Sequence, residues 1–297
     1  MSGLWAIFTV IAAAGQVLRN AQQKELTQSL GTVGATHVRF LFGLPFGVIF
    51  LLIVLACTGL PMPKLGCAML GWSVAGALTQ IAATALLLAA MRERSFVIIT
   101  AYAKTEPVQV ALFAFAFLGD HITAGVAAAI AVATGGVLLA SWPRKSSGGQ
   151  GFTWYPALLG IGSGALFAIA AIGFRGGIRA LDTPSFVMGA TVTLAFGLTI
   201  QTVLLSAYLW LFDRETLLAI LRLWRPSLLA GFTGAFASQM WFLAFALETA
   251  AKVRTLALIE ILFAQVLSRN LFKQKLASRE AAGIGLIVAG VILLLNV

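Results

Sequence analysis

Long apolar stretches separated by short polar connections run along the whole chain. A helix needs about 20 residues to cross a hydrocarbon core of about 30 Å, because each residue adds about 1.5 Å. The stretches do not alternate apolar and polar residues, as membrane β-strands of about ten residues would. The pattern therefore predicts an all-α polytopic membrane protein with ten transmembrane helices, at residues 4–22, 34–57, 68–90, 96–118, 124–142, 155–175, 185–211, 227–247, 255–272 and 279–296.

The composition agrees with a hydrocarbon solvent. Hydrophobic residues make up 60% of the chain and charged residues 10%, and the mean hydropathy is +0.97. A soluble domain needs roughly a quarter of its residues charged. The net charge is +10, but basic residues that flank membrane spans meet lipid headgroups, so we expect membrane lipid and no nucleic acid as a partner.

A flexible composition occurs once, near the midpoint of the chain. Residues 144–151 read RKSSGGQG, which is typical of a linker, and five predicted spans lie on each side. We therefore predict a first five-helix repeat at 1–142, a linker at 143–154 and a second five-helix repeat at 155–297.

The two halves are similar in sequence. A shift of 154 residues places Glu106 on Glu260 and Gly136 on Gly290, and near residues 11–13 and 169–171 the shift becomes 158. Because each half has an odd number of spans, the second half enters the membrane from the opposite side, and the repeats are inverted. Inverted repeats around a central cavity are typical of alternating-access transporters.

Three short runs carry a family resemblance: TEPV at 105–108, LGDHIT at 118–123 and GGVLL at 135–139. With them the chain resembles the EamA-like, ten-span members of the drug/metabolite transporter superfamily, and it is most similar to the YddG-type exporters of aromatic amino acids. Asp120 stands where Glu is usual, and the second copy is weak, with FKQKL at 272–276. The resemblance implies amino-acid export across a bacterial-type inner (cell) membrane by a multi-pass protein.

The fourth span carries the most informative polar residues. Tyr102 and Glu106 are four residues apart on one helix face, and Pro107 lacks the N–H that the carbonyl of Ala103 would accept. We predict a helix kink at Pro107 beside a substrate site. Lys104 lies about 200° around the helix from Glu106, so we expect no ion pair between these two. A structural acid bonded to a neighbouring helix is an equal alternative for Glu106 and for its counterpart Glu260.

In the first span, Gln16, Asn20 and Gln23 form a polar stripe that we expect to face the interior. Arg19 lies beside this stripe, and for Arg19 and Gln23 an interfacial helix end is the favoured alternative.

Other spans add further candidates, since a polar side chain at bilayer depth needs a partner or a wet cavity. In the second span, Arg39 either reaches the headgroups or binds a substrate carboxylate through its planar fork. His37 is a weaker candidate for a proton-linked step. The predicted substrate-binding residues are His37, Arg39, Gln80, Tyr102, Glu106, Gln239, Trp241 and Glu260.

Two series of small residues recur at intervals of four, the spacing that lets two helix backbones approach closely. We expect both series to pack inside the molecule. They are Ala127, Ala131 and Gly135, and Ala281, Gly285 and Ala289.

The longest connection, 212–226, has an amphipathic pattern. Charged residues at 213–215 precede apolar residues at 217, 218, 220 and 221. This pattern predicts a short helix at the membrane interface.

The distribution of Lys and Arg predicts the orientation. The odd-numbered connections and adjoining helix ends hold 13 of them, and the even-numbered ones hold 5. The positive-inside rule therefore places both termini outside. The ten-span family implies cytoplasmic termini instead.

The sequence holds none of the common enzyme or nucleotide-binding motifs, so we expect no catalytic residue, no metal and no cofactor. We predict a secondary transporter that exports small amphiphilic metabolites, with amino acids including aromatic ones as the substrate class that the family implies. A membrane enzyme or scaffold with structural intramembrane acids is the alternative, as is a transporter of other metabolites or drugs. Proton coupling and a homodimer are left open.

Overall fold

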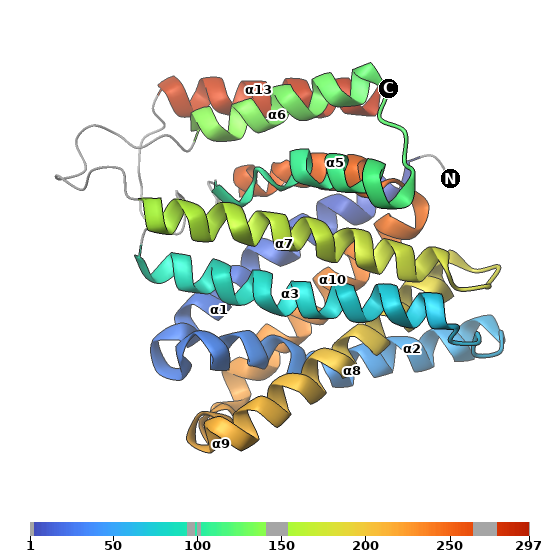
Figure 1. Cartoon of the computed structure of the whole chain (residues 1–297), viewed down its shortest axis with the longest axis vertical. Helices are drawn as coiled ribbons and strands as arrows, with labels where there is room; N and C mark the ends of the chain where they lie inside the picture. The colour runs from blue at the N-terminus through green and yellow to red at the C-terminus, as the bar shows by residue number, and fades with distance from the viewer. Residues whose placement is uncertain (1–2, 94–98, 100–101, 141–153, 264–277, 297) are drawn as a thin grey trace.

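The computed structural model describes residues 3–93, 99, 102–140, 154–263 and 278–296, and all regular elements within these ranges are helices (Figure 1). The elements are α1 (Leu4–Leu41), α2 (Leu44–Thr58), α3 (Cys67–Glu93), α5 (Glu106–Leu118), α6 (Ala124–Ala140), α7 (Trp154–Arg179), α8 (Phe186–Phe212), α9 (Arg214–Arg222), α10 (Trp224–Leu247), α11 (Ala250–Leu256), the 3₁₀ turn η1 (Ala257–Ile259) and α13 (Ser278–Leu295).

Within the described residues, five helical segments are long and apolar enough to cross a membrane: Leu4–Thr58, Cys67–Glu93, Trp154–Arg179, Phe186–Phe212 and Trp224–Leu247. Shorter apolar helices cover Glu106–Leu118, Ala124–Leu139 and Ala281–Leu295. The chain is therefore a polytopic membrane protein. Three of the predicted spans, 96–118, 124–142 and 255–272, include residues that are not described, so ten spans stay a prediction. Residues 143–153 of the predicted linker also lie outside the described ranges.

The exterior is apolar, and many polar and charged side chains are inside, which is the reverse of a soluble protein. Large apolar side chains such as Leu52, Leu112 and Leu211 are exposed on three different helices. Hydrocarbon chains, not water, are the solvent that such a surface favours. Six charged side chains that will form the site below are buried: Arg19, Arg39, Lys104, Glu106, Arg254 and Glu260.

The first two predicted spans needed correction. The polar segment between them, 23–33, is helical, and α1 continues to Leu41 with one break at Gly31, where φ is 66° and ψ is −177°. Gln, Lys, Glu and Leu in this segment are good helix formers, so propensity outweighed polarity. Across the break, Gln23 Nε2 donates to the carbonyl of Ala35 at 3.0 Å, which ties the two parts of α1 together.

Proline and glycine set the ends of two helices. Pro45 and Pro107 stand in the first turns of α2 and α5, where a missing N–H costs nothing. Gly59 and Gly119 end the same helices with positive φ values of 63° and 64°, which side chains with a Cβ rarely adopt.

Helices from the two halves pack in pairs. α1 packs along α10, α3 along α7 and α2 along α8, while α6 and α13 lie side by side at one edge of the bundle (Figure 1). Glycines allow the closest approaches. A Cβ on Gly15 would lie 3.1 Å from Ala237 Cβ, and one on Gly173 would lie 2.8 Å from Gly76 Cα. Many interior contacts therefore bring residues of one half against residues of the other.

The face through which α6 and α13 meet differs from the predicted one. Gly136 lies so close to α13 that a Cβ there would be 2.7 Å from the Ile287 nitrogen, and a Cβ on Gly290 would be 2.7 Å from Ala133. All six residues of the two small-residue series are exposed, so the expected packing of those series inside the molecule was wrong. Both helices are apolar all round, and such a sequence does not tell which face packs.

The amphipathic connection is a helix, as predicted. Asp213 is the N-cap of α9 and accepts from the Thr216 backbone nitrogen at 3.1 Å and from its hydroxyl at 2.7 Å. Ile220 is buried, whereas Leu218 and Leu221 are exposed. These two hydrogen bonds lower the pKa of the Asp213 carboxyl below its ordinary value of 3.8.

Candidate functional site

A break in the helical backbone positions Glu106. Lys104 and Thr105 form a turn, α5 begins at Glu106, and the Thr105 nitrogen donates to the carbonyl of Tyr102 at 3.3 Å. Pro107 therefore lies in the first turn of a new helix and not in the middle of a kinked one, which refines the predicted kink. The carbonyl of Ala103 faces α7, where a Cβ on Gly164 would come within 2.7 Å of it. Gly164 thus lets α7 cover the broken backbone.

A second break positions Glu260. α11 ends at Leu256, the 3₁₀ turn η1 follows, and helical residues resume at Glu260. Both glutamates therefore stand directly after an interruption of the helix. Interrupted backbone at membrane depth is tolerated where protein packs around it or where it lines a cavity.

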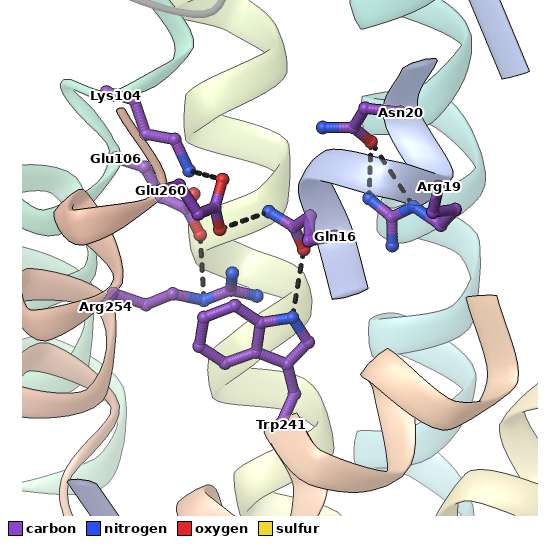
Figure 2. A network of polar contacts seen from close by, with 8 residues as sticks. All are labelled: Gln16, Arg19, Asn20, Lys104, Glu106, Trp241, Arg254 and Glu260. Atoms are coloured by element: carbon purple, nitrogen blue, oxygen red, sulfur yellow. Dashed lines mark hydrogen bonds and ion pairs between the residues drawn. The ribbon is translucent and has the colours of Figure 1, made fainter. Parts of the chain in front are cut away.

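Glu260 is the centre of a buried hydrogen-bond network (Figure 2). Its Oε2 accepts from Lys104 Nζ at 2.5 Å, and its Oε1 accepts from Gln16 Nε2 at 2.7 Å. Gln16 Oε1 in turn accepts from Trp241 Nε1 at 2.9 Å. Helices α1 and α10 and the two breaks are therefore joined through one carboxylate and one amide.

Glu106 belongs to a second ion pair in the same place. Arg254 Nε lies 3.0 Å from Glu106 Oε1, in a geometry that is not aligned for a hydrogen bond. The guanidinium carbon of Arg254 also lies 4.5 Å from the ring centre of Trp241 and 5.3 Å from that of Phe245. Such contacts over ring faces add cation–π attraction.

The two ion pairs cross between the halves of the chain. Lys104 from the first half binds Glu260 from the second, and Arg254 from the second half binds Glu106 from the first. Lys104 thus pairs with Glu260 and not with Glu106, as the helix geometry predicted. Each pair is buried, and removing one member would leave an unpaired charge.

Arg19 and Arg39 are buried without a carboxylate partner among the described residues. Arg19 donates only to Asn20 Oδ1, from Nε at 3.3 Å and from Nη2 at 2.8 Å. Arg39 donates to the hydroxyls of Thr84 at 3.3 Å and Ser238 at 3.2 Å. Arg39 therefore reaches neither solvent nor headgroups, since only 2% of its surface is exposed.

The structure brings some of the predicted site residues together and leaves others apart. Glu106, Trp241 and Glu260 meet in the network described above. Gln80 accepts from Gln201 at 2.8 Å. The remaining three pack elsewhere: Gln239 donates to Thr191 at 2.8 Å, His37 Nε2 lies 3.0 Å from the Ser206 hydroxyl, and Tyr102 packs on Gly160 of α7.

Sequence reasoning missed two members of the network. Lys104 was expected only to point away from Glu106, and its partner lies 156 positions further along the chain. Arg254 immediately precedes the predicted ninth span and was counted only among the charges that set orientation. No local spacing reveals either pairing. The sequence does show one basic residue within a helical turn of each backbone break, Lys104 at the first and Arg254 at the second, and such a residue is a candidate partner for a buried glutamate.

Asp120 of the family-like run has a structural environment. Its carboxylate binds Arg175 Nη1, and Arg179 Nη1 lies 3.3 Å from its other oxygen. Arg175 Nε also donates to the carbonyl of Glu248 at 3.1 Å. These contacts tie the end of α5 to the end of α7 and the end of α10.

Comparisons with known proteins identify a family domain in the second half of the chain. Residues 154–296 match the EamA-like transporter family. The chain carries an EamA-like transporter domain. The match spans α7 to α13 and thus covers the half that contributes Trp241, Arg254 and Glu260. This family, together with the apolar helices, indicates a multi-pass membrane transporter of small metabolites.

A solved structure shares the fold of the chain. It is described only as "Crystal structure of protein", with a TM-score of 0.71, 15% sequence identity, and coverage of 98% of this chain and 94% of the other. At this identity the likeness concerns the fold alone. None of the curated proteins compared with the chain matches it. Among the described residues, no group of three or more His, Cys, Asp or Glu side chains could hold a metal ion.

Proposed function

We propose that this protein is a secondary transporter that exports small amphiphilic metabolites, amino acids with large side chains among them, across a bacterial-type inner membrane by alternating access. The observation that carries the proposal is the pair of crossed, buried ion pairs, Lys104–Glu260 and Arg254–Glu106, at two interruptions of the helical backbone.

The energetic cost of these charges supports a functional role. A charged side chain at the centre of a membrane helix costs about 2.5–3.5 kcal/mol on insertion scales, and ion pairs repay this cost only in part. A helix bundle has no structural need for so many buried charges, because apolar packing and small residues suffice. In transporters, interrupted helices with charged or amide side chains form the substrate site.

Two sets of contacts support an inverted repeat. The shift of 154 residues turns Ala133 into Ile287 and Gly136 into Gly290, and the contact of Gly136 with Ile287 is thereby exchanged with the contact of Gly290 with Ala133. Helix pairing is exchanged in the same way. α1 and α7 are the first helices of the two halves, α3 and α10 are the corresponding later ones, and α1 packs on α10 as α7 packs on α3. A two-fold relation between the halves produces such exchanged contacts.

In the proposed mechanism the crossed pairs hold the halves in one access state. A substrate ammonium competes with Lys104 and Arg254 for the two carboxylates, and the pairs then separate and allow the halves to rock. The rings of Trp241 and Phe245 are stacked 6.2 Å apart and offer an apolar wall for a large side chain. Trp241 is held in place by its hydrogen bond to Gln16.

Flux of labelled Phe, Met and Thr into liposomes that contain the purified protein tests the proposal. We expect saturable flux of at least the first two. Flux per folded protein should be lost in Glu106→Gln, and it is normalised in this way because the stranded Arg254 charge destabilises the variant. Glu25→Gln, an exposed glutamate of α1, is the matched control and should transport normally. Absence of saturable flux for all three amino acids would contradict amino-acid export. Normal flux in Glu106→Gln would remove Glu106 from the substrate site.

A further inference from the structure

We infer that Arg19 and Arg39 form an anion subsite, in which two buried guanidinium groups bind the carboxylate of the substrate. The inference rests on the proposed transport function and names the substrate group that this part of the site recognises. Four observations carry it: a surplus of buried positive charge, the closeness of the two arginines, their unused donors, and their position beside Glu260.

The buried charges do not balance. Among the described residues, the buried anions are Glu106 and Glu260, and the buried cations are Arg19, Arg39, Lys104, Arg175 and Arg254. Arg175 is paired with Asp120, which leaves four cations for two anions and a surplus of 4 − 2 = 2 positive charges. The sequence has ten acidic residues, and Glu280 is the one whose side chain is not described. Since Lys104 and Arg254 each have a glutamate, the surplus lies on Arg19 and Arg39.

The two arginines, both from α1, pack next to each other against Gly234 of α10. A Cβ on Gly234 would be 3.1 Å from Arg39 Cγ and 3.5 Å from Arg19 Cδ, so the glycine leaves room for both stems. Two like charges repel each other, and the repulsion is strong where water is excluded. An anion between the guanidinium groups would replace this repulsion by attraction.

Both guanidinium groups have donors to spare. Each has five N–H donors, yet Arg39 uses one at Thr84 and one at Ser238, and its Nε is buried without a partner. All hydrogen bonds of Arg19 end on a single oxygen of Asn20. The partners are neutral and weak compared with a carboxylate, which matches the guanidinium fork in shape and charge.

The subsite adjoins the ion-pair network. Arg19 is three residues from Gln16 on α1, so the two side chains lie on neighbouring parts of one helix face (Figure 2). Gln16 binds Glu260 directly. A substrate with its carboxylate on the arginines therefore has its other groups near Glu260 and Trp241.

Three ligands with the same phenyl ring test the inference: phenylalanine, 3-phenylpropionate and 2-phenylethylamine. The melting temperature and the dissociation constant are measured in detergent for the whole protein. We expect phenylalanine and 3-phenylpropionate to bind and stabilise the wild type, and 2-phenylethylamine to bind more weakly than either, because it lacks the carboxylate. The Arg39→Met variant should weaken 3-phenylpropionate binding by about tenfold or more, since a hydrogen bond to a charged group is lost.

The ligand-free protein gives a second readout. Arg39→Met removes an unpaired buried charge, so its melting temperature without ligand should equal or exceed that of the wild type. Arg39→Lys keeps the charge without the planar fork and should bind 3-phenylpropionate more weakly than the wild type. Arg19→Met should resemble Arg39→Met. Arg222→Met, an exposed arginine of α9, is the matched control and should leave binding unchanged.

The inference is overturned if 3-phenylpropionate does not bind the wild type, if 2-phenylethylamine binds equally well, or if Arg39→Met binds normally and melts at a lower temperature. Its failure is distinguishable from that of the proposed function. Amino-acid flux that is unchanged in Arg39→Met would reject the anion subsite and keep the transporter. Binding of 3-phenylpropionate that depends on Arg39, without flux of any amino acid, would keep the subsite and reject amino-acid export.

Discussion

Replacing Lys104 by Met tests whether the crossed ion pairs stabilise the fold. Lys104 Nζ lies 2.5 Å from Glu260 Oε2, and the two side chains are 7% and 2% exposed. Met has a similar length and no charge. After the replacement, Glu260 retains only the hydrogen bond from Gln16 and becomes a buried, unpaired carboxylate.

The expected cost follows from that stranded charge. Removing one partner of a buried pair destabilises a protein by about 3–5 kcal/mol, whereas replacing both by neutral side chains is nearly neutral. We therefore expect Lys104→Met to lower the free energy of unfolding by about this amount. The double variant Lys104→Met/Glu260→Gln should recover most of it. The coupling energy between the two positions should then be on the order of 3 kcal/mol.

Unfolding of the four members of this double-mutant cycle in mixed detergent micelles measures the coupling. Lys64→Met, which changes an exposed lysine, is the control and should not affect stability. If the two single variants are as stable as the wild type, or if their effects simply add, the pair does not stabilise the fold and the reasoning is refuted.

Three further predictions concern other parts of the chain. Gly136→Ala should destabilise the pairing of α6 with α13 by about 1–3 kcal/mol, because its Cβ would lie 2.7 Å from α13 backbone, while Gly135→Ala, with no atom within 4 Å of its Cβ, should be neutral in the same unfolding assay. Asp213→Ala should lower the melting temperature at neutral pH, because the Asp213 pKa is depressed and its stabilisation exists above the unfolded pKa. That difference should shrink as the pH falls through the depressed folded pKa, and a constant difference would contradict the assignment. The charge distribution places the C-terminus outside, so a reporter that works only outside the cytoplasm should be active when it is fused after Val297. Activity of a reporter that works only in the cytoplasm would overturn this orientation.

Much of the fold could be predicted from the sequence, because apolar length alone identifies a helix that crosses a membrane. Helix boundaries in polar segments could not be predicted in this way. The polar residues before Gly31 favour helix whatever their polarity, so α1 continues through a segment that hydropathy assigned to a connection. The packing faces of α6 and α13 were also beyond prediction, because Gly135 and Gly136 look equivalent in a helix without a polar side.

The candidate site was predictable only in part. Glu106, Trp241, Glu260 and Arg39 were selected because a polar group inside a membrane is costly, and this argument is local. Their partners depend on which helices meet, and Lys104 and Glu260 meet only after the two halves have packed together. Gln239 was selected for its depth. Its amide donates to Thr191 of α8, and its place in the substrate site stays a prediction.

Counterflow of phenylalanine in proteoliposomes tests alternating access most directly. Vesicles are loaded with unlabelled phenylalanine, and the uptake of labelled phenylalanine from outside is followed with time. A transporter that exposes one site to each side in turn exchanges the two, so the label should accumulate transiently above its external concentration and then decline. Uptake that rises only to equilibrium, at a rate independent of internal phenylalanine, would contradict the account.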